Sequence, residues 1–192
     1  MRAVLKYVGA VSICAALATC IVFVTDSAAQ SGKTSRSQAG SAVNSSKAAP
    51  IFGITLPAGY RDWRLISVAH EEGNLNDIRA ILGNDVAIKA YRRGTLPFPD
   101  GTIIARLSWK YLPSEENNKV FGRDQSFVPG AATDWYLQFM VKDAKKYATT
   151  HGWGYAQFDK NGIPADEAKL KTCAPCHEPD KANDFVFTHY AP

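Results

Sequence analysis

Two cysteines and a histidine close to the C-terminus constrain the fold of this chain more than any other feature. They form the run Cys173-Ala174-Pro175-Cys176-His177. Two cysteines separated by two residues and followed at once by a histidine are the attachment pattern of a c-type haem. Thiols at this spacing reach the two vinyl groups of one porphyrin, and the adjacent imidazole becomes the proximal ligand of the iron. The pattern predicts one covalent haem c, so the fold must accommodate a porphyrin beside this segment.

Other interpretations of the cysteine pair agree less well with the chain. A thioredoxin-type redox pair belongs in a βαβ unit, and a structural zinc site needs a second pair of ligands at regular spacing. The remaining cysteines, Cys14 and Cys20, lie in an N-terminal apolar run, and the histidines make no such spacing with the pair. A chance match without a cofactor is the third alternative. The haem interpretation is the one that the other features of the sequence support.

The N-terminus has the parts of a secretory signal peptide. Arg2 and Lys6 form a basic start, residues 8–24 are mostly apolar, and residues 27–29 are small. This arrangement predicts a signal peptide over residues 1–29 that is cleaved after Ala29. We expect export to the periplasm, because c-type haem is attached outside the bacterial cytoplasm. An uncleaved membrane anchor is the alternative, since the apolar run is near the lower limit for spanning a membrane.

Composition divides the rest of the chain into two parts. Residues 30–49 are almost all Ser, Gly, Ala, Lys and Asn. Such a segment cannot bury enough apolar surface to offset the entropy of ordering, so we predict a flexible linker. Residues 50–192 have the length of one domain with a hydrophobic core. The chain has 22 Lys and Arg against 18 Asp and Glu, which gives a net charge of +4, but the basic residues are dispersed along the sequence. Nucleic acid is therefore not an expected partner.

Hydrophobic periodicity in residues 50–192 predicts more strand than helix. Strands are expected over residues 63–68, 77–82, 101–110, 135–141 and 153–158. Short helices are expected over 84–94, where Asn84 is a good N-cap and Gly94 a good stop, over 142–150, and from Pro164 towards the haem motif. Residues 113–130 are predicted to form a polar loop with a short strand near Phe121. We therefore expect an α+β fold, mainly an antiparallel β-sheet with a few short helices and a C-terminal haem-attachment segment.

The clearest alternation in the chain lies between residues 101 and 110. It places Ile103, Ala105, Leu107 and Trp109 on one face of a strand and Ile104, Arg106, Ser108 and Lys110 on the other.

The iron has no obvious sixth ligand in this sequence. Met140 is the only methionine after the predicted cleavage site, and it precedes the haem motif by a long stretch. The other candidates are His70, His151, His189 or a lysine. An isolated histidine is more often a surface residue than a ligand. We expect an open or weakly filled position, which favours binding of small molecules over simple electron transfer. A plain periplasmic electron-transfer cytochrome c is the alternative.

Several segments around the haem motif together resemble the cytochrome P-460 family, over about residues 60–192. They are Gly-Tyr-Arg-Asp-Trp at 59–63, Phe-Pro-Asp-Gly-Thr at 98–102, Val-Lys-Asp-Ala-Lys at 141–145 and Asp-Phe-Val-Phe-Thr at 184–188. The resemblance implies a periplasmic, largely antiparallel β-sheet protein that is commonly dimeric and carries a five-coordinate c-type haem. The family includes enzymes that oxidise hydroxylamine. Its relatives, the beta-type cytochromes c-prime, bind nitric oxide and similar gases.

Two positions depart from the hydroxylamine-oxidising members. Those proteins bond a lysine to the porphyrin edge, and matching the turn at residues 100–102 puts Arg106 at that position, with Lys110 as the only local substitute for the cross-link. The family's pocket carboxylate falls on Gln138. The resemblance makes Arg106 and Gln138 candidate pocket residues. Their alternatives are a surface charge or a haem-propionate partner for Arg106, and an ordinary polar strand residue for Gln138.

With these departures, the resemblance implies a haem protein that binds or oxidises small nitrogen compounds, and it leaves turnover of hydroxylamine open. A redox partner protein and a second copy of the chain are the expected macromolecular partners.

Overall fold

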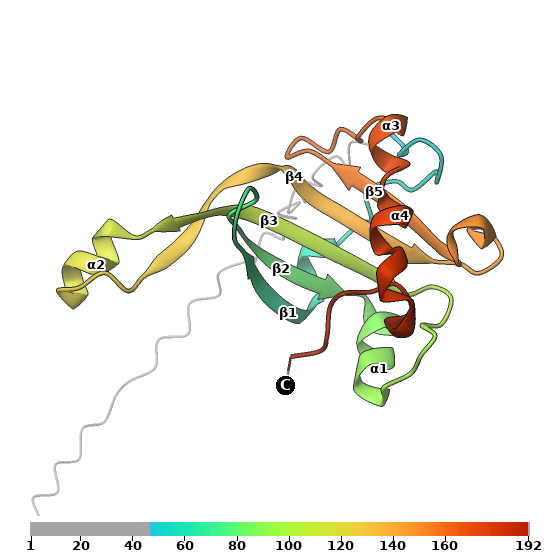
Figure 1. Ribbon diagram of the computed structural model, residues 1–192, viewed down its shortest axis with the longest axis horizontal. Helices are drawn as coiled ribbons and strands as arrows, with labels where there is room; N and C mark the ends of the chain where they lie inside the picture. The colour runs from blue at the N-terminus through green and yellow to red at the C-terminus, as the bar shows by residue number, and fades with distance from the viewer. Residues whose placement is uncertain (1–46, 192) are drawn as a thin grey trace, which may run out of the picture. The chain divides into compact units, whose positions relative to one another are not determined.

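A computed structural model describes residues 47–191, and its central element is a five-stranded antiparallel β-sheet (Figure 1). The strands lie side by side in the order of the sequence. They are β1 (Arg64–Glu71), β2 (Asp77–Gly83), β3 (Ile103–Pro113), β4 (Phe127–Lys142) and β5 (Trp153–Phe158). The helices are α1 (Asp85–Arg93), α2 (Glu115–Phe121), α3 (Glu167–Leu170) and α4 (Cys173–His177), with 3-10 helices η1 (Tyr60–Asp62), η2 (Ala148–Thr150) and η3 (Glu178–Asn183). The predicted α+β fold is confirmed.

The predicted signal peptide, residues 1–29, and residues 30–46 of the predicted linker lie outside the described residues. Ala49, at the predicted end of the linker, packs with the folded domain: it is buried, and its backbone bonds to Gly53 and Ile54 at 3.0 and 2.8 Å. Within residues 47–191, no helix is long and apolar enough to cross a membrane.

Helix α1 has the bounds that its capping residues predict. The Asn84 Oδ1 accepts hydrogen bonds from the backbone N–H of Ala87 at 2.9 Å and of Ile103 at 3.1 Å. The first bond caps the helix, and the second joins it to the start of β3. Gly94 ends the helix in a left-handed conformation, with φ of 62°.

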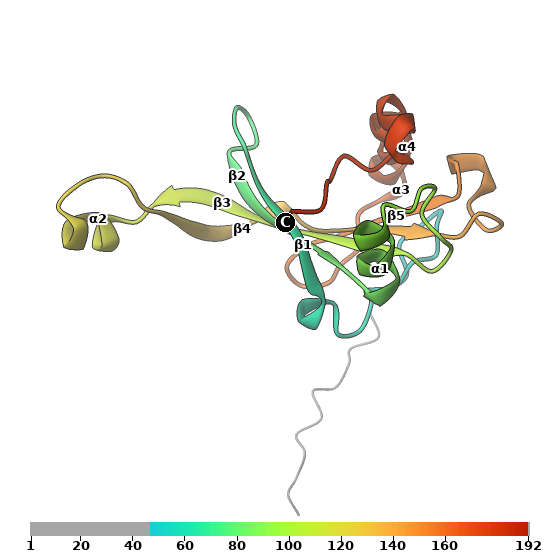
Figure 2. The same cartoon turned by 90° about the horizontal axis from the view of Figure 1, so that it is seen from below.

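The stretch at residues 113–130 is not the loop that the sequence predicts, and the strand expected near Phe121 is absent from this described stretch. Helix α2 occupies residues 115–121, and β4 already begins at Phe127. Ser114 caps α2 by accepting from the N–H of Asn117, and Gly122 ends it with φ of 68°. Helix α2 buries no side chain, so it lacks the apolar period on which the prediction relied. It lies at the tip of an arm formed by the outer parts of β3 and β4 (Figures 1 and 2).

Two predicted helices near the C-terminus were also wrong in extent. Strands β4 and β5 pair up to Lys142 and Trp153, so the chain must reverse within residues 143–152. It does so through turns and the short helix η2 instead of a helix over 142–150. Pro164 forms an isolated bridge with Phe158. Helix α3 therefore begins later, at Glu167, where Asp166 supplies the cap.

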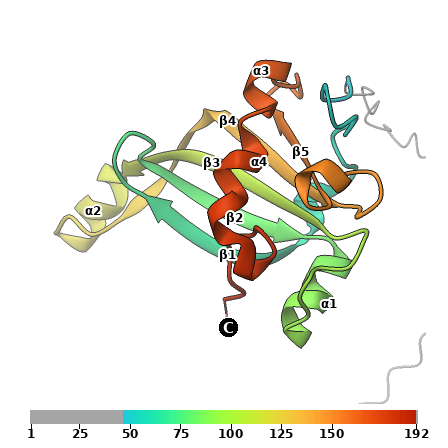
Figure 3. The same ribbon diagram turned by 45° about the vertical axis from the view of Figure 1, so that its right-hand side comes forward.

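The two sides of the sheet carry different side chains. The register of β3 confirms the predicted alternation, and it aligns Arg106 with Gln138 on β4, which in turn pairs with Gln157 on β5. The next row on the same side ends at Tyr155, whose ring lies 5.2 Å from that of His177 in α4. We call this side the α4 face, because α4 crosses the sheet there (Figure 3).

The opposite side of the sheet is apolar. Phe139 and Phe158 are buried there with ring centroids 6.0 Å apart, and the ring of Tyr60 packs edge-on against Phe139. Buried apolar side chains thus lie on both sides of the sheet, because Ile104, Met140 and Tyr155 are buried on the α4 face as well, and the polar side chains gather on the α4 face alone.

Candidate functional site

The haem motif forms helix α4. Cys173, Cys176 and His177 are spaced three and four positions apart, so they lie on one side of the helix. Pro175 is the third helical residue, where a missing N–H leaves no intrahelical bond unmade. Both cysteines are free of disulfide bonds. Burial raises the pKa of the Cys173 thiol to about 11, so that thiol is neutral at physiological pH.

The imidazole of His177 has one nitrogen already engaged. Its Nδ1 lies 2.7 Å from the backbone oxygen of Phe185. A carbonyl oxygen can only accept, so Nδ1 must carry the proton and Nε2 keeps its lone pair. Burial lowers the pKa of His177, which favours this neutral ring. An N–H donated to a backbone carbonyl is the usual second contact of a metal-ligating histidine. The donor set therefore fits a haem iron bound through Nε2.

Six side chains on the α4 face form a linked series, which we call the polar chain. In order across β1 to β5 they are Glu71, Arg79, Asp77, Arg106, Gln138 and Gln157. At the centre of this chain, Arg106 donates to Asp77 Oδ2 at 2.5 Å and to Gln138 Oε1 at 3.1 Å. The Gln138 amide then donates to Gln157 Oε1 at 3.3 Å.

Asp77 is the buried charge on which the polar chain depends. It is 1% exposed and accepts from Arg79 at 2.6 and 3.0 Å as well as from Arg106. A carboxylate in this position is tolerated because two guanidinium groups compensate it. Burial, with repulsion from Arg79, lowers the pKa of Arg106, while attraction to Asp77 opposes that shift. The guanidinium stays charged because its unperturbed pKa is above ~12.

The two candidate pocket residues are brought together by the fold. Arg106 and Gln138 are direct cross-strand neighbours and hydrogen-bond to each other. Lys110 lies on the same side of β3 but is exposed, and in the register it is opposite Asp77, towards the arm. The lysine proposed as a substitute for the cross-link is thus four residues, or two periods of strand alternation, beyond Arg106 at the centre of the polar chain.

The candidate sixth ligands are dispersed. Met140 is 9% exposed on the α4 face, in the row that ends at Tyr155. His70 is exposed and stacks on Tyr111 at 3.9 Å, near the other end of the sheet. The remaining two are His151, which pairs with Glu178, and His189, which is exposed.

The sequence reasoning missed Asp77, Gln157 and the pair of Lys142 with Asp184. Asp77 alternates with Arg79 and Ile81 on one face of β2. A carboxylate at the same phase as a cation within a predicted strand was the available signal. Gln157 carried no such signal, because its partner Gln138 is on another strand. Lys142 Nζ lies 2.8 Å from the Asp184 carboxylate across 42 residues of sequence.

Helix α4 carries two cysteines and an imidazole whose Nε2 keeps its lone pair, and it lies against a polar face of the sheet. These groups have the chemistry of a c-type cytochrome. The sequence model described as cytochrome P460 matches residues 57–188. The chain therefore belongs to the cytochrome P460 family of haem c cytochromes, and this membership implies a haem cofactor. A comparison with curated proteins found no match.

The buried position of Asp77 predicts a large cost for removing its charge. We expect Asp77→Asn to lower the free energy of unfolding by ~3–5 kcal/mol, because the partly buried Arg106 loses a carboxylate partner and Arg79 keeps only the half-exposed Glu71. Asp85→Asn is the matched control. Its pair with Arg64 at 2.5 Å is exposed, with side chains 78% and 49% accessible, so the loss should stay below ~1 kcal/mol. Urea denaturation of both variants measures the difference, and equal losses would contradict the central role of Asp77.

Proposed function

We propose that this protein is an exported mono-haem cytochrome that binds small nitrogen compounds, such as nitric oxide or hydroxylamine, at an open iron position. Cys173 and Cys176 hold the haem covalently, and His177 is its axial ligand. The observation that carries the proposal is the bond between Arg106 and Gln138. The positions at which the resemblance expects a lysine and a carboxylate are neighbours in the register, and here they hold a guanidinium and an amide.

When bound, a haem with one protein ligand offers its iron to small ligands and exchanges single electrons. The side chains of the α4 face supply hydrogen bonds and positive charge beside that position. Arg106 has a fixed charge and five donors, which suit a propionate or a polarised ligand. Gln138 and Gln157 can donate and accept hydrogen bonds but cannot take up a proton as a carboxylate does.

The nearest carboxylate in the polar chain is Asp77, and both of its oxygens already accept from arginines. Glu71, the other carboxylate of the polar chain, lies on the edge strand β1 and pairs with Arg79. Proton removal from a bound hydroxylamine therefore has no unpaired carboxylate among these six side chains to act as the base. This arrangement supports ligand binding more than hydroxylamine oxidation.

Electron transfer to a redox partner protein is the second candidate function. The position of Met140 favours it, because this thioether is the one sixth-ligand candidate of those named that lies on the α4 face beside Tyr155. A carrier benefits from two strong axial ligands, which keep reorganisation small.

We also propose export to the periplasm and assembly into a homodimer. Export is supported by the signal-peptide pattern of residues 1–29. Dimerisation is supported by the arm, whose exposed apolar side chains are Leu112, Val120, Phe121 and Phe127, 43–78% accessible. Apolar side chains gathered on a projecting arm mark an interaction surface, and a second copy of the chain is the proposed partner.

The attachment proposal predicts that haem stays on the polypeptide after acid-acetone extraction, because thioether bonds survive it. Cys173→Ala and Cys176→Ala should each lower the haem recovered per chain, and His177→Ala should alter the optical spectrum most. Thr172→Ala is the control, since this exposed residue directly precedes the motif and should leave haem content unchanged. Complete passage of the haem into acetone would end the c-type assignment.

The second prediction concerns the porphyrin edge. A guanidinium is a poor nucleophile because it stays protonated, so we expect only the two thioether bonds, an ordinary Soret band, and weak or absent oxidation of hydroxylamine. Arg106→Lys places an amine at the cross-linking position and should give a Soret band displaced to the red. Arg79→Lys, in the same polar chain, is the matched control and should leave the band in place. Haem recovered by mass spectrometry on a peptide containing Lys110 would refute this prediction.

The two candidate functions differ in the spin state that they predict. An open iron position gives a high-spin ferric signal in electron paramagnetic resonance, and the ferrous protein should bind nitric oxide. Met140→Leu should leave both properties unchanged, because the substitution conserves volume. A low-spin signal that becomes high-spin in Met140→Leu would identify Met140 as the sixth ligand and would move the electron-transfer function to first place.

A further inference from the structure

The segment that follows η3 has an unusual backbone. Asp184 and Phe185 adopt left-handed conformations in succession, with φ of 51° and 65°, and neither is glycine. Side chains with a Cβ atom rarely adopt this conformation. It persists only where surrounding contacts over-determine it. The contacts of these two residues therefore indicate what the segment is built to hold.

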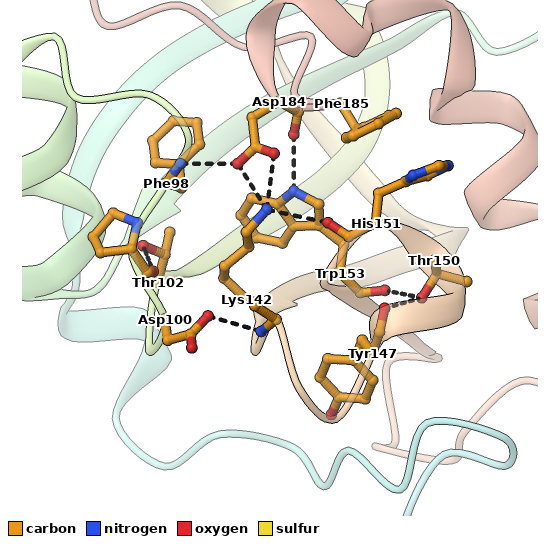
Figure 4. Close-up of polar contacts among 12 residues, drawn as sticks. Phe98, Asp100, Thr102, Lys142, Tyr147, Thr150, His151, Trp153, Asp184 and Phe185 are labelled. Atoms are coloured by element: carbon orange, nitrogen blue, oxygen red, sulfur yellow. Dashed lines mark hydrogen bonds and ion pairs between the residues drawn. The ribbon is translucent and has the colours of Figure 1, made fainter.

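The Asp184 carboxylate and carbonyl are both fixed by the body of the domain (Figure 4). The carboxylate accepts from Lys142 Nζ at 2.8 and 2.9 Å and from the backbone N–H of Phe98 at 2.8 Å. The carbonyl accepts from Trp153 Nε1, also at 2.8 Å. The last residue of β4 and the first residue of β5 thus both donate hydrogen bonds to Asp184.

Lys142 is itself buried, with 6% of its side chain exposed. Its Nζ donates to the carbonyl of His151 at 3.2 Å and lies 4.8 Å from the centre of the Trp153 ring. An ammonium group in this setting depends on its anionic partner, so the pair with Asp184 behaves as one unit.

Phe185 connects this pair to the haem motif. Its ring is buried and stacks on His151 at 4.3 Å, and its N–H donates to the carbonyl of Asp180 at 2.8 Å. The carbonyl of Phe185 then accepts from His177 Nδ1 at 2.7 Å. The left-handed turn is what directs this carbonyl at the imidazole while the ring stays packed.

We propose that Lys142 and Asp184 are positioning residues for the axial histidine. By fixing the left-handed turn, their ion pair holds the Phe185 carbonyl on His177 Nδ1 and so sets the orientation and electron donation of the ring. The proposal rests on the proposed function, in which His177 binds the iron. It assigns a redox-tuning role to two residues that touch neither the motif nor the porphyrin attachment points.

The physical consequence concerns the strength of the iron–imidazole bond. A hydrogen bond from Nδ1–H to a carbonyl makes the ring a better electron donor at Nε2. Better donation favours ferric over ferrous iron, so it lowers the reduction potential. Losing the pair frees the turn, lengthens this hydrogen bond, and weakens the donation.

The test compares Lys142→Met, Asp184→Ala and the charge-balanced double variant. Thioether attachment should keep haem on all three, measured as haem per chain. We expect the iron–histidine stretching frequency of the ferrous protein, measured by resonance Raman, to fall in all three. The midpoint potential of the double variant should rise, because the imidazole donates less to the iron and the unchanged net charge adds no electrostatic shift of its own. Lys171→Met is the control, since its pair with Glu167 is exposed, and it should change neither quantity.

These readouts separate the possible explanations. A simple charge effect would move the potential in opposite directions in Lys142→Met and Asp184→Ala and would leave the frequency unchanged. A purely structural role would lower the melting temperature alone. Either result overturns the proposal, as does an unchanged frequency in a folded double variant. If the other variants fail to fold, Asp184→Asn takes their place, because its side chain keeps an accepting oxygen. We expect a smaller fall in the iron–histidine frequency in this variant, and no fall would overturn the proposal. Absence of haem from the unsubstituted protein would instead refute the proposed function.

Discussion

The ion pair between Lys142 and Asp184 joins the sheet to the C-terminal segment. One partner lies at the end of β4 and the other beyond η3, and both are less than a tenth exposed. Burial makes such a pair costly to separate, because either charge alone would be left without water or a counter-ion. In the proposed arrangement, the direction of the Phe185 carbonyl and the orientation of the His177 ring depend on this contact.

The α4 face combines fixed charge with a polar chain in which both carboxylates are paired with arginines. Asp77 is balanced by Arg79 and Arg106, and the two glutamines continue the hydrogen bonds to β5. A site of this kind can orient and polarise a small ligand without taking its proton. A lysine and a carboxylate on the same two strands would give different chemistry from nearly the same backbone. The fold is therefore compatible with both binding and oxidation, and the side chains decide between them.

Sequence patterns predicted the elements whose signals are local. Hydrophobic periodicity predicted the five strands except for the first part of β4, which begins at Phe127 inside the expected loop. The cap Asn84 and the stop Gly94 predicted α1, because a cap and a stop act within a few residues. Helix α2 was missed because it buries no side chain and has no apolar period. In the site, Cys173 to His177 are contiguous and were predicted directly. Asp77 and Asp184 were not, because burial and pairing across strands are properties of the folded register, and no glycine marks the left-handed turn at residues 184–185.

The order of the strands bears on how a porphyrin can be added to the chain. Each strand pairs with its neighbour in sequence, and the sheet is complete at Phe158, before the first cysteine of the motif. Nearest-neighbour pairing closes short loops and forms early in folding. The segment after β5 can thus remain an undocked tail on an already assembled scaffold, accessible to the machinery that the proposed thioether attachment requires. Under that proposal, docking of the tail through Asp184 is the last step of maturation, made on a chain that already carries its cofactor.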